Sequence, residues 1–400
     1  MGIYEELGLE PIINASGAVT RLGGAPLYPA ALDAFGQAAG QTVPLEQLHA
    51  VACRQIAEAT GTEAGLVTSG AAAALTLGTA AILAGHDLAR IERLPDCSGM
   101  PCEFVVAREH RNGYDHAVRA AGARFVEVGF HELAAGSGVR RAEAWEYEAA
   151  FGPHTAGVLY VLSKGACPPL KDVVERAHAH YLPVLVDAAG ELPPRANLKT
   201  IAATGADLVA FSGGKAIRGP QATGILCGRR ELISSAAIQM LDMDDHLELW
   251  QPPAELIDRE QLPGMPRHGI GRGFKVAKEQ IVALLVALRA FASGEYDALV
   301  EGYRARLDEI CAALADVPAR CHVQASDGES LPILEILVDE RALGRTAIEV
   351  CRALRAGLPP CYVGHAALAE GTLVINPLHL DERNTPELAR RLREELTTKS

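Results

Sequence analysis

Aromatic and basic residues are both in short supply in this chain, and both shortages limit what it can bind. Phe, Trp and Tyr together make up 5% of the sequence, too few to predict the aromatic platforms on which single-stranded nucleic acid stacks. The 37 Lys and Arg are outnumbered by 50 Asp and Glu, a net charge of −13, and an acidic chain repels a phosphate backbone. Nucleic acid is therefore a disfavoured partner.

The chain also lacks a long apolar run and any paired cysteine motif. The longest candidate span, residues 71–84, is rich in Ala, interrupted by Thr and Gly, and shorter than a membrane helix requires. The first ten residues carry three Glu and no basic residue, unlike a secretory or mitochondrial signal, so we expect a cytoplasmic protein. The nine Cys are scattered without a CxxC, which indicates free thiols and no metal site.

What the chain does contain is the pattern of an α/β protein. Its 400 residues, with 49% hydrophobic and 22% charged, predict a globular chain of more than one domain. Short apolar runs alternate with amphipathic stretches, and runs of this kind are typical of parallel strands covered by helices on both faces. The runs lie at residues 104–106, 125–128, 158–162, 184–186, 208–211 and 223–227.

A second, smaller α/β pattern follows a break. Residues 250–273 contain four Pro and several Gly, which favours an extended segment, and residues 274–291 then read as a long helix. We therefore predict a large domain over residues 1–274 and a small domain over residues 275–400. Residues 1–20 can pack on either.

Two polar residues at the ends of apolar runs carry the main chemical signal. Asp187 ends one buried run, where ligands bind in open α/β sheets, and Lys215 lies in a Gly-rich turn after another. Alone, such an Asp often caps a turn and such a Lys is usually solvated. Together they match what pyridoxal 5'-phosphate (PLP) requires, a lysine to form an imine and a carboxylate to pair with the pyridinium nitrogen.

A phosphate site is predicted at the segment Ser69-Gly70-Ala71. A short apolar run precedes it and an Ala-rich helix follows, so free backbone amides and the positive end of a helix dipole meet there. Ordinary N-capping by Ser69 is the competing interpretation. Ser212, just before the Lys215 turn, is a second candidate phosphate ligand.

The chain resembles the fold-type I PLP enzymes, in the branch related to bacterial L-seryl-tRNA selenium transferase, and within that branch it looks most like the D-glucosaminate-6-phosphate ammonia-lyase group. The likeness covers nearly the whole length. It is carried by the Asp187 and Lys215 segments and by residues 13–17, 20–24, 67–73, 94–96, 110–117 and 271–279.

The resemblance implies further site residues. His110 is the candidate to stack on the PLP ring, with Arg111 as the alternative, although His110 can also simply cap the helix that follows. Arg272, with Lys275, is implied as a phosphate ligand, including across a subunit boundary, because fold-type I sites are commonly built between two subunits. A homodimer or a larger homo-oligomer is therefore expected. Two further residues, Arg21 and Arg218, are candidates for a substrate carboxylate, a group that a planar guanidinium binds with two hydrogen bonds.

The resemblance also implies an activity. We expect a PLP-dependent ammonia-lyase that converts a β-hydroxy amino acid or amino-sugar acid, such as D-glucosaminate or its 6-phosphate, into a 2-keto-3-deoxy acid and ammonia. A racemase, an aldolase, a β-replacement enzyme of the selenium-transferase kind and a non-catalytic PLP-binding protein remain as alternatives. The acidic composition favours a small-molecule substrate over tRNA.

Overall fold

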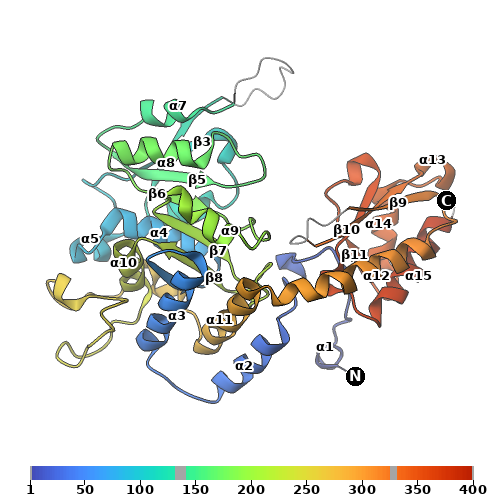
Figure 1. Ribbon diagram of the computed structural model, residues 1–400, viewed down its shortest axis with the longest axis horizontal. Coiled ribbons are helices and arrows are strands. Elements are labelled where there is room, and N and C mark those ends of the chain that lie inside the picture. Colours follow the sequence, from blue (N-terminus) through green and yellow to red (C-terminus); the bar gives the residue numbers. More distant parts are fainter. Residues whose placement is uncertain (1, 131–140, 325–330, 399–400) are drawn as a thin grey trace. The chain divides into compact units, whose positions relative to one another are not determined.

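The computed structural model describes residues 2–130, 141–324 and 331–398, and these divide into two compact units (Figure 1). The large unit is Leu27–Ala292, and the small unit joins Met1–Pro26 to Ser293–Ser400. The division at Ser293 differs from the predicted boundary near residue 275, because helix α11 (Lys278–Ser293) packs on the large unit through Leu284. The N-terminal segment belongs to the small unit because β1 (Ile13–Ala15) pairs in parallel with β11 (Cys361–Val363).

A seven-stranded sheet forms the centre of the large unit. Its strands are β2 (Ala64–Thr68), β8 (Gly224–Gly228), β7 (Leu208–Ser212), β6 (Val184–Asp187), β5 (Thr155–Val161), β3 (Glu103–Ala107) and β4 (Arg124–Val128), in that spatial order. Only β8 runs antiparallel to its neighbours. The sheet is therefore mostly parallel, which confirms the predicted α/β architecture with a mostly parallel sheet in the large domain.

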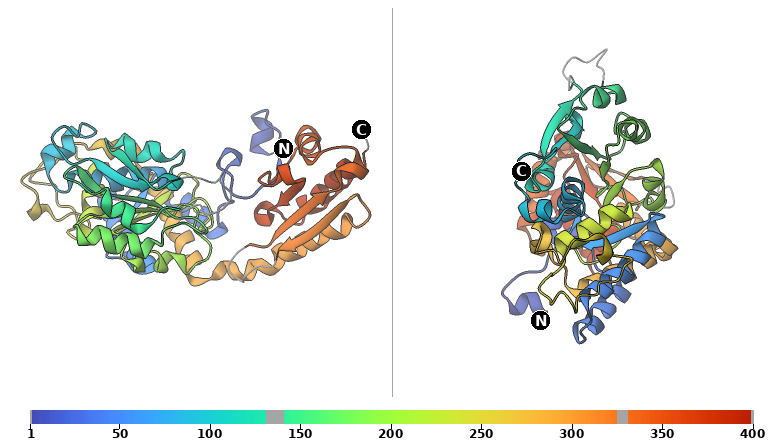
Figure 2. Two further views of the ribbon diagram at one scale, coloured as in Figure 1. Left: turned by 90° about the horizontal axis from the view of Figure 1, so that it is seen from above. Right: turned by 90° about the vertical axis from the view of Figure 1, so that its left-hand side faces the viewer.

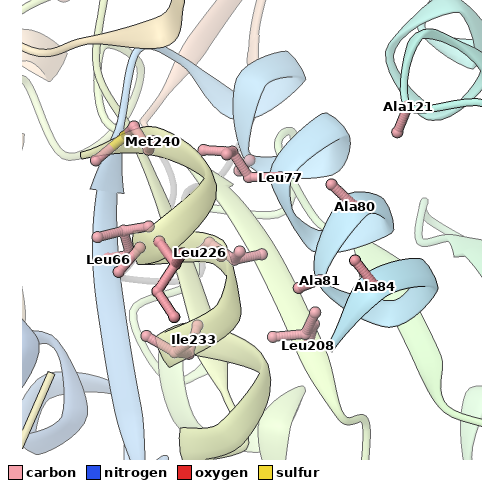
Figure 3. Packing of buried hydrophobic residues seen from close by; sticks show 14 of the residues in the cluster. Leu66, Leu77, Ala80, Ala81, Ala84, Ala121, Leu208, Leu226, Ile233 and Met240 are labelled. Carbon is pink, nitrogen blue, oxygen red and sulfur yellow. The ribbon is translucent and has the colours of Figure 1, made fainter. Parts of the chain in front are cut away.

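Helices cover both faces of this sheet (Figure 2). On one face, α4 (Ala71–Ala84) and α10 (Arg230–Met240) pack against Leu66, Leu208 and Leu226 (Figure 3). On the other face lies α3 (Leu45–Thr60), so close that a Cβ on Gly65 would come within 2.1 Å of Ile56. Because it is enclosed in this core, α4 can be apolar on all sides. Neither α4 nor any other described helix has the length and hydropathy needed to span a bilayer.

The remaining elements of the large unit are short and connect or flank the strands. Its helices are α2 (Pro29–Ala39), α5 (Leu88–Arg93), α6 (Asp115–Ala120), α7 (Ala144–Ala149), α8 (Leu170–Ala179) and α9 (Asn197–Thr200), and its 3-10 turns are η2 (Arg108–His110), η4 (Ala202–Thr204), η5 (Arg259–Gln261) and η6 (Ile270–Phe274).

The small unit has a core of its own. An antiparallel sheet of β12 (Thr372–Ile375), β10 (Ile333–Val338) and β9 (Ala319–Gln324) shares this apolar core with α12 (Val300–Ala313), α14 (Ala347–Ala356) and α15 (Asn384–Thr397). Its shorter elements are α1 (Ile3–Glu6), η1 (Thr20–Leu22), η7 (Glu295–Leu299), α13 (Glu340–Leu343), η8 (Leu368–Glu370) and η9 (Pro377–His379).

Candidate active site

The strand directions bring four of the predicted segments to one edge of the large sheet. Strands β2, β7, β6 and β3 run the same way, so their carboxyl ends share that edge. Ser69 to Ala71 follow β2, Lys215 follows β7, Asp187 ends β6 and His110 follows β3. This is the edge at which open α/β sheets bind ligands.

Asp187 ends β6, Lys215 lies in the turn that follows the neighbouring strand β7, and the two side chains interact electrostatically. Asp187 is 7% exposed, and its Oδ1 accepts a hydrogen bond of 3.0 Å from the amide of Ala189. Burial raises the pKa of the Asp187 carboxyl, whereas the Ala189 amide and the charge of Lys215 lower it. Within the described residues Oδ2 accepts no hydrogen bond. The carboxylate is thus poorly solvated, and a cation placed beside it would offset that cost.

Glycines allow the Lys215 turn to lie close to the neighbouring backbone. A Cβ on Gly213 would lie 2.3 Å from Oγ1 of Thr223, and one on Gly214 would lie 2.4 Å from Cα of Gln221. The amide of Arg218 closes the turn by donating to the Lys215 carbonyl at 2.9 Å. The two glycines before Lys215 are therefore required by packing, and they leave the lysine half-buried at the sheet edge.

The predicted phosphate turn has free amides at the start of α4. The N-cap is Gly70, with φ of 102° and no side-chain cap, so Ser69 is not the N-cap that the competing interpretation required. A Cβ on Gly224 would lie 2.4 Å from the Gly70 carbonyl carbon, which explains why a glycine begins β8. Gly224 is also in register with Ser212, so both predicted phosphate segments flank this strand.

His110 and Arg111 differ in the contacts that their side chains already make. His110 is 5% exposed, its ring lies edge-on to Tyr160 at 4.5 Å, and the Tyr147 hydroxyl lies 3.4 Å from Nδ1. Its Nε2 is buried without a hydrogen-bond partner, and burial lowers the pKa of His110 to about 4, so the ring is neutral at neutral pH. Arg111 instead binds Asp115 and Glu127. These contacts favour His110 as the ring-stacking residue.

We expect His110→Ala to weaken PLP binding roughly tenfold, because about 1.4 kcal/mol of ring contact is lost. His110→Phe keeps a flat ring and should retain PLP nearly as well as the wild type. Equilibrium dialysis followed by cofactor absorbance measures both. If Arg111→Lys loses PLP and His110→Ala does not, the ring contact belongs to Arg111.

The predicted phosphate ligands Arg272 and Lys275 lie in η6 and directly after it. Arg272 forms an ion pair with Asp242, whose pKa is lowered by hydrogen bonds, first from His268. Lys275 is exposed. Among the described residues, no hydrogen bond or ion pair joins either side chain to Lys215 or Asp187. A role for them in this site stays a prediction that depends on a second subunit.

The two predicted carboxylate ligands lie in different units. Arg218 is part of the Lys215 turn and adopts a φ of 59°, a left-handed backbone conformation that is rare outside glycine. Arg21 belongs to the small unit, where its guanidinium lies 5.5 Å from the centre of the Tyr362 ring.

Sequence reasoning missed one acidic residue, Glu191. Burial and the charge of Asp187 raise the pKa of the Glu191 carboxyl, and the charge of Lys215 lowers it, so all three groups share one electrostatic environment. The amide of Glu191 donates to the Ala188 carbonyl at 3.1 Å, which folds the chain back after β6. The feature of the sequence that could have identified Glu191 is its position in the turn directly after Asp187. The described residues contain no cluster of metal-ligating side chains.

Comparisons with known proteins agree with this geometry. Residues 146–242 match the aminotransferase class-V family. A 5'-C-glycyluridine monooxygenase-decarboxylase from a Streptomyces species is 33% identical, over 98% of this chain and 91% of that protein. The D-glucosaminate-6-phosphate ammonia lyase of Salmonella typhimurium is 30% identical, over 98% of this chain and 97% of that enzyme. A solved ammonia-lyase structure of that name covers 99% of this chain and 98% of its own, with a TM-score of 0.81 and 29% identity.

Proposed function

Since this chain belongs to the PLP-dependent enzymes of fold type I, in the group that contains D-glucosaminate-6-phosphate ammonia lyase and L-seryl-tRNA selenium transferase, we propose that it is an ammonia-lyase. Its proposed substrates are β-hydroxy amino acids or amino-sugar acids such as D-glucosaminate and its 6-phosphate. The observation that carries the proposal is the Lys215–Asp187 pair, at the ligand-binding edge of the sheet, in a full-length relative of a known ammonia lyase.

The residues at the sheet edge fit PLP. Asp187 presents a poorly solvated carboxylate, His110 has an unpartnered buried nitrogen, and the start of α4 offers uncapped amides. Asp187 would hold the pyridinium nitrogen, while the turn at Ser69–Ala71 and Ser212 would hold the phosphate. When bound, PLP supplies a ring that accepts electrons from the substrate Cα.

Lys215 would have two tasks in the reaction. Its amine would anchor the cofactor, and in the reaction Nζ would accept the proton from the substrate Cα as a general base. Asp187 would hold the pyridinium nitrogen with its negative charge. The β-hydroxyl then leaves as water, and hydrolysis with one water yields a 2-keto-3-deoxy acid and ammonia. Atoms balance, since one water leaves and one is consumed.

A second candidate activity follows from the Streptomyces relative, which is 33% identical and is a monooxygenase-decarboxylase. That chemistry would consume oxygen and release carbon dioxide. Racemisation, aldol cleavage and β-replacement also start from an amino acid bound through its amine, so the Lys215–Asp187 pair is compatible with each of them. The presence of both residues disfavours a non-catalytic PLP-binding protein.

One experiment separates these activities. The holoenzyme is incubated, in air and under nitrogen, with D-glucosaminate, its 6-phosphate or 5'-C-glycyluridine. We expect equal amounts of keto acid and ammonia from one of the two sugar acids, with the same rate under nitrogen. Oxygen uptake with carbon dioxide release from 5'-C-glycyluridine, and no keto acid from either sugar acid, would replace the lyase with the second candidate.

The proposal extends to assembly and location. We propose a homodimer or larger homo-oligomer, in which Arg272 of one subunit would contribute to the Lys215–Asp187 site of another, as the likeness to fold-type I enzymes implies. We also propose a cytoplasmic location, because all nine cysteines are free thiols, as is usual in a reducing compartment.

A further inference from the structure

A cavity in the small unit has three arginines in its lining. It has a volume of about 320 Å³, and its lining includes Arg21, Arg352, Arg355 and His365. The other lining residues are Ile348, Cys351 and Leu368, so no carboxylate is among them. All of these residues lie within the small unit. In a chain with a net charge of −13, a cavity lined by three guanidinium groups and no acid calls for an explanation.

The three arginines lack the carboxylate partners that other arginines of this unit have. Arg345, Arg391 and Arg393 all form ion pairs with Asp or Glu, whereas no ion pair in the described part of the chain involves Arg21, Arg352 or Arg355. Glu349 lies three residues before Arg352 and has its pKa lowered, mainly by hydrogen bonds with Thr346 and only weakly by Arg352. That carboxylate is therefore already engaged.

Arg355 is the least satisfied of the three. Its Nε is buried without a hydrogen-bond partner, and its guanidinium lies 5.2 Å from the centre of the Tyr362 ring. Arg21 lies 5.5 Å from the same ring centre, so Tyr362 supports two guanidinium groups that come from distant parts of the chain. An unpartnered buried donor costs free energy that a ligand can recover.

The helix dipole explains only part of this arrangement. Arg352 and Arg355 lie in the last turns of α14 and share one face, because residues three apart on a helix are neighbours. Positive charge is favoured at a helix C-terminus. That effect accounts neither for Arg21, which comes from η1, nor for the buried donor of Arg355.

We propose that this cavity is a binding site for a phosphate group, held by Arg21, Arg352 and Arg355. Guanidinium groups bind phosphate through paired, charge-assisted hydrogen bonds, and a dianion matches several converging positive charges better than a single carboxylate does. The phosphate is either that of a phosphorylated substrate or free phosphate acting as an effector. The first source rests on the proposed function, and the second does not.

The test is a calorimetric titration of the holoenzyme with inorganic phosphate, at constant ionic strength set with chloride. Using the holoenzyme keeps the cofactor's own phosphate site filled. We expect saturable binding in the wild type and affinity about tenfold weaker or worse in Arg355→Gln, because a charge-assisted contact to the phosphate is lost. Arg352→Gln, at an exposed position, gives the same loss without disturbing the core. Arg320→Gln, an exposed arginine on β9, is the matched control and should bind as the wild type does.

Absence of saturable binding in the wild type, or equal affinity in all the variants, would overturn the proposal. Kinetics then separate the two sources. If Arg352→Gln raises KM for D-glucosaminate 6-phosphate and leaves KM for D-glucosaminate unchanged, the site takes the substrate's phosphate. If neither KM changes while the titration is lost, the ligand is free phosphate. If the enzyme converts neither compound, the proposed lyase function fails, but the titration still decides the phosphate site.

Discussion

Lys215→Ala is expected to abolish keto-acid formation and to remove the visible absorption band of PLP bound as an imine. The variant loses both the amine that anchors the cofactor and the proposed base at Cα, and loss of general-base catalysis alone costs up to about 10,000-fold in rate. Absorption spectra with added PLP, together with the keto-acid assay, measure the two effects separately.

The matched control is Lys199→Ala, because Lys199 is an exposed lysine on α9 in the same unit. It should keep both the band and the activity. A Lys215→Ala protein that still shows the imine band would mean that a different lysine binds PLP, and the site proposed here would then be wrong.

Asp187→Asn should lower kcat by about 100- to 1,000-fold while the protein still binds PLP, because one preorganised charge is lost and Lys215 remains. The amide has almost the same shape and can still accept the hydrogen bond from Ala189. Glu191→Gln is the comparison, since Glu191 lies in the same electrostatic environment. A larger loss in Glu191→Gln than in Asp187→Asn would exchange the roles of the two acids.

Asp187→Asn is also expected to change the stability of the cofactor-free protein. Burial raises the pKa of Asp187 above its usual value, and a carboxyl with a raised folded-state pKa stabilises the fold only while it is protonated. That contribution is lost as the pH rises through the folded-state pKa. At neutral pH the charged Asp187 therefore costs stability in the cofactor-free protein. Thermal unfolding of apo Asp187→Asn should occur at or above the wild-type temperature, and a clear fall would contradict this account.

The sequence predicted best those features whose place in the fold is marked by a local residue pattern. Strands buried on both faces read as uninterrupted apolar runs, so the sequence alone predicts that Asp187 ends one strand and that Lys215 lies in the turn after another. The Gly70 turn was recognisable for the same reason, because a helix start directly after a strand has a local signature.

Other features depend on contacts between distant residues and have no local pattern. The pairing of Ile13 with Cys361 joins segments that are far apart along the chain, so residues 1–20 could not be assigned to one domain. Helix α11 looks the same in sequence whichever unit it packs on. Arg352 and Arg355 look like ordinary charges near the end of a helix, and only the position of Arg21 and Tyr362 reveals the cavity.

The pairing of β1 with β11 also bears on how the protein is made. The small unit consists of the first 26 residues and the chain after residue 292, so on the ribosome its first segment emerges long before its partner strand exists. The large unit is continuous in sequence and can fold during that interval, as domains commonly do during synthesis. Until then, the apolar Ile13 strand is an unpaired edge of the kind that invites aggregation. Slow or arrested translation of about the last hundred residues would leave this strand unpaired for the longest time. Binding by a chaperone would prevent aggregation most effectively during that period.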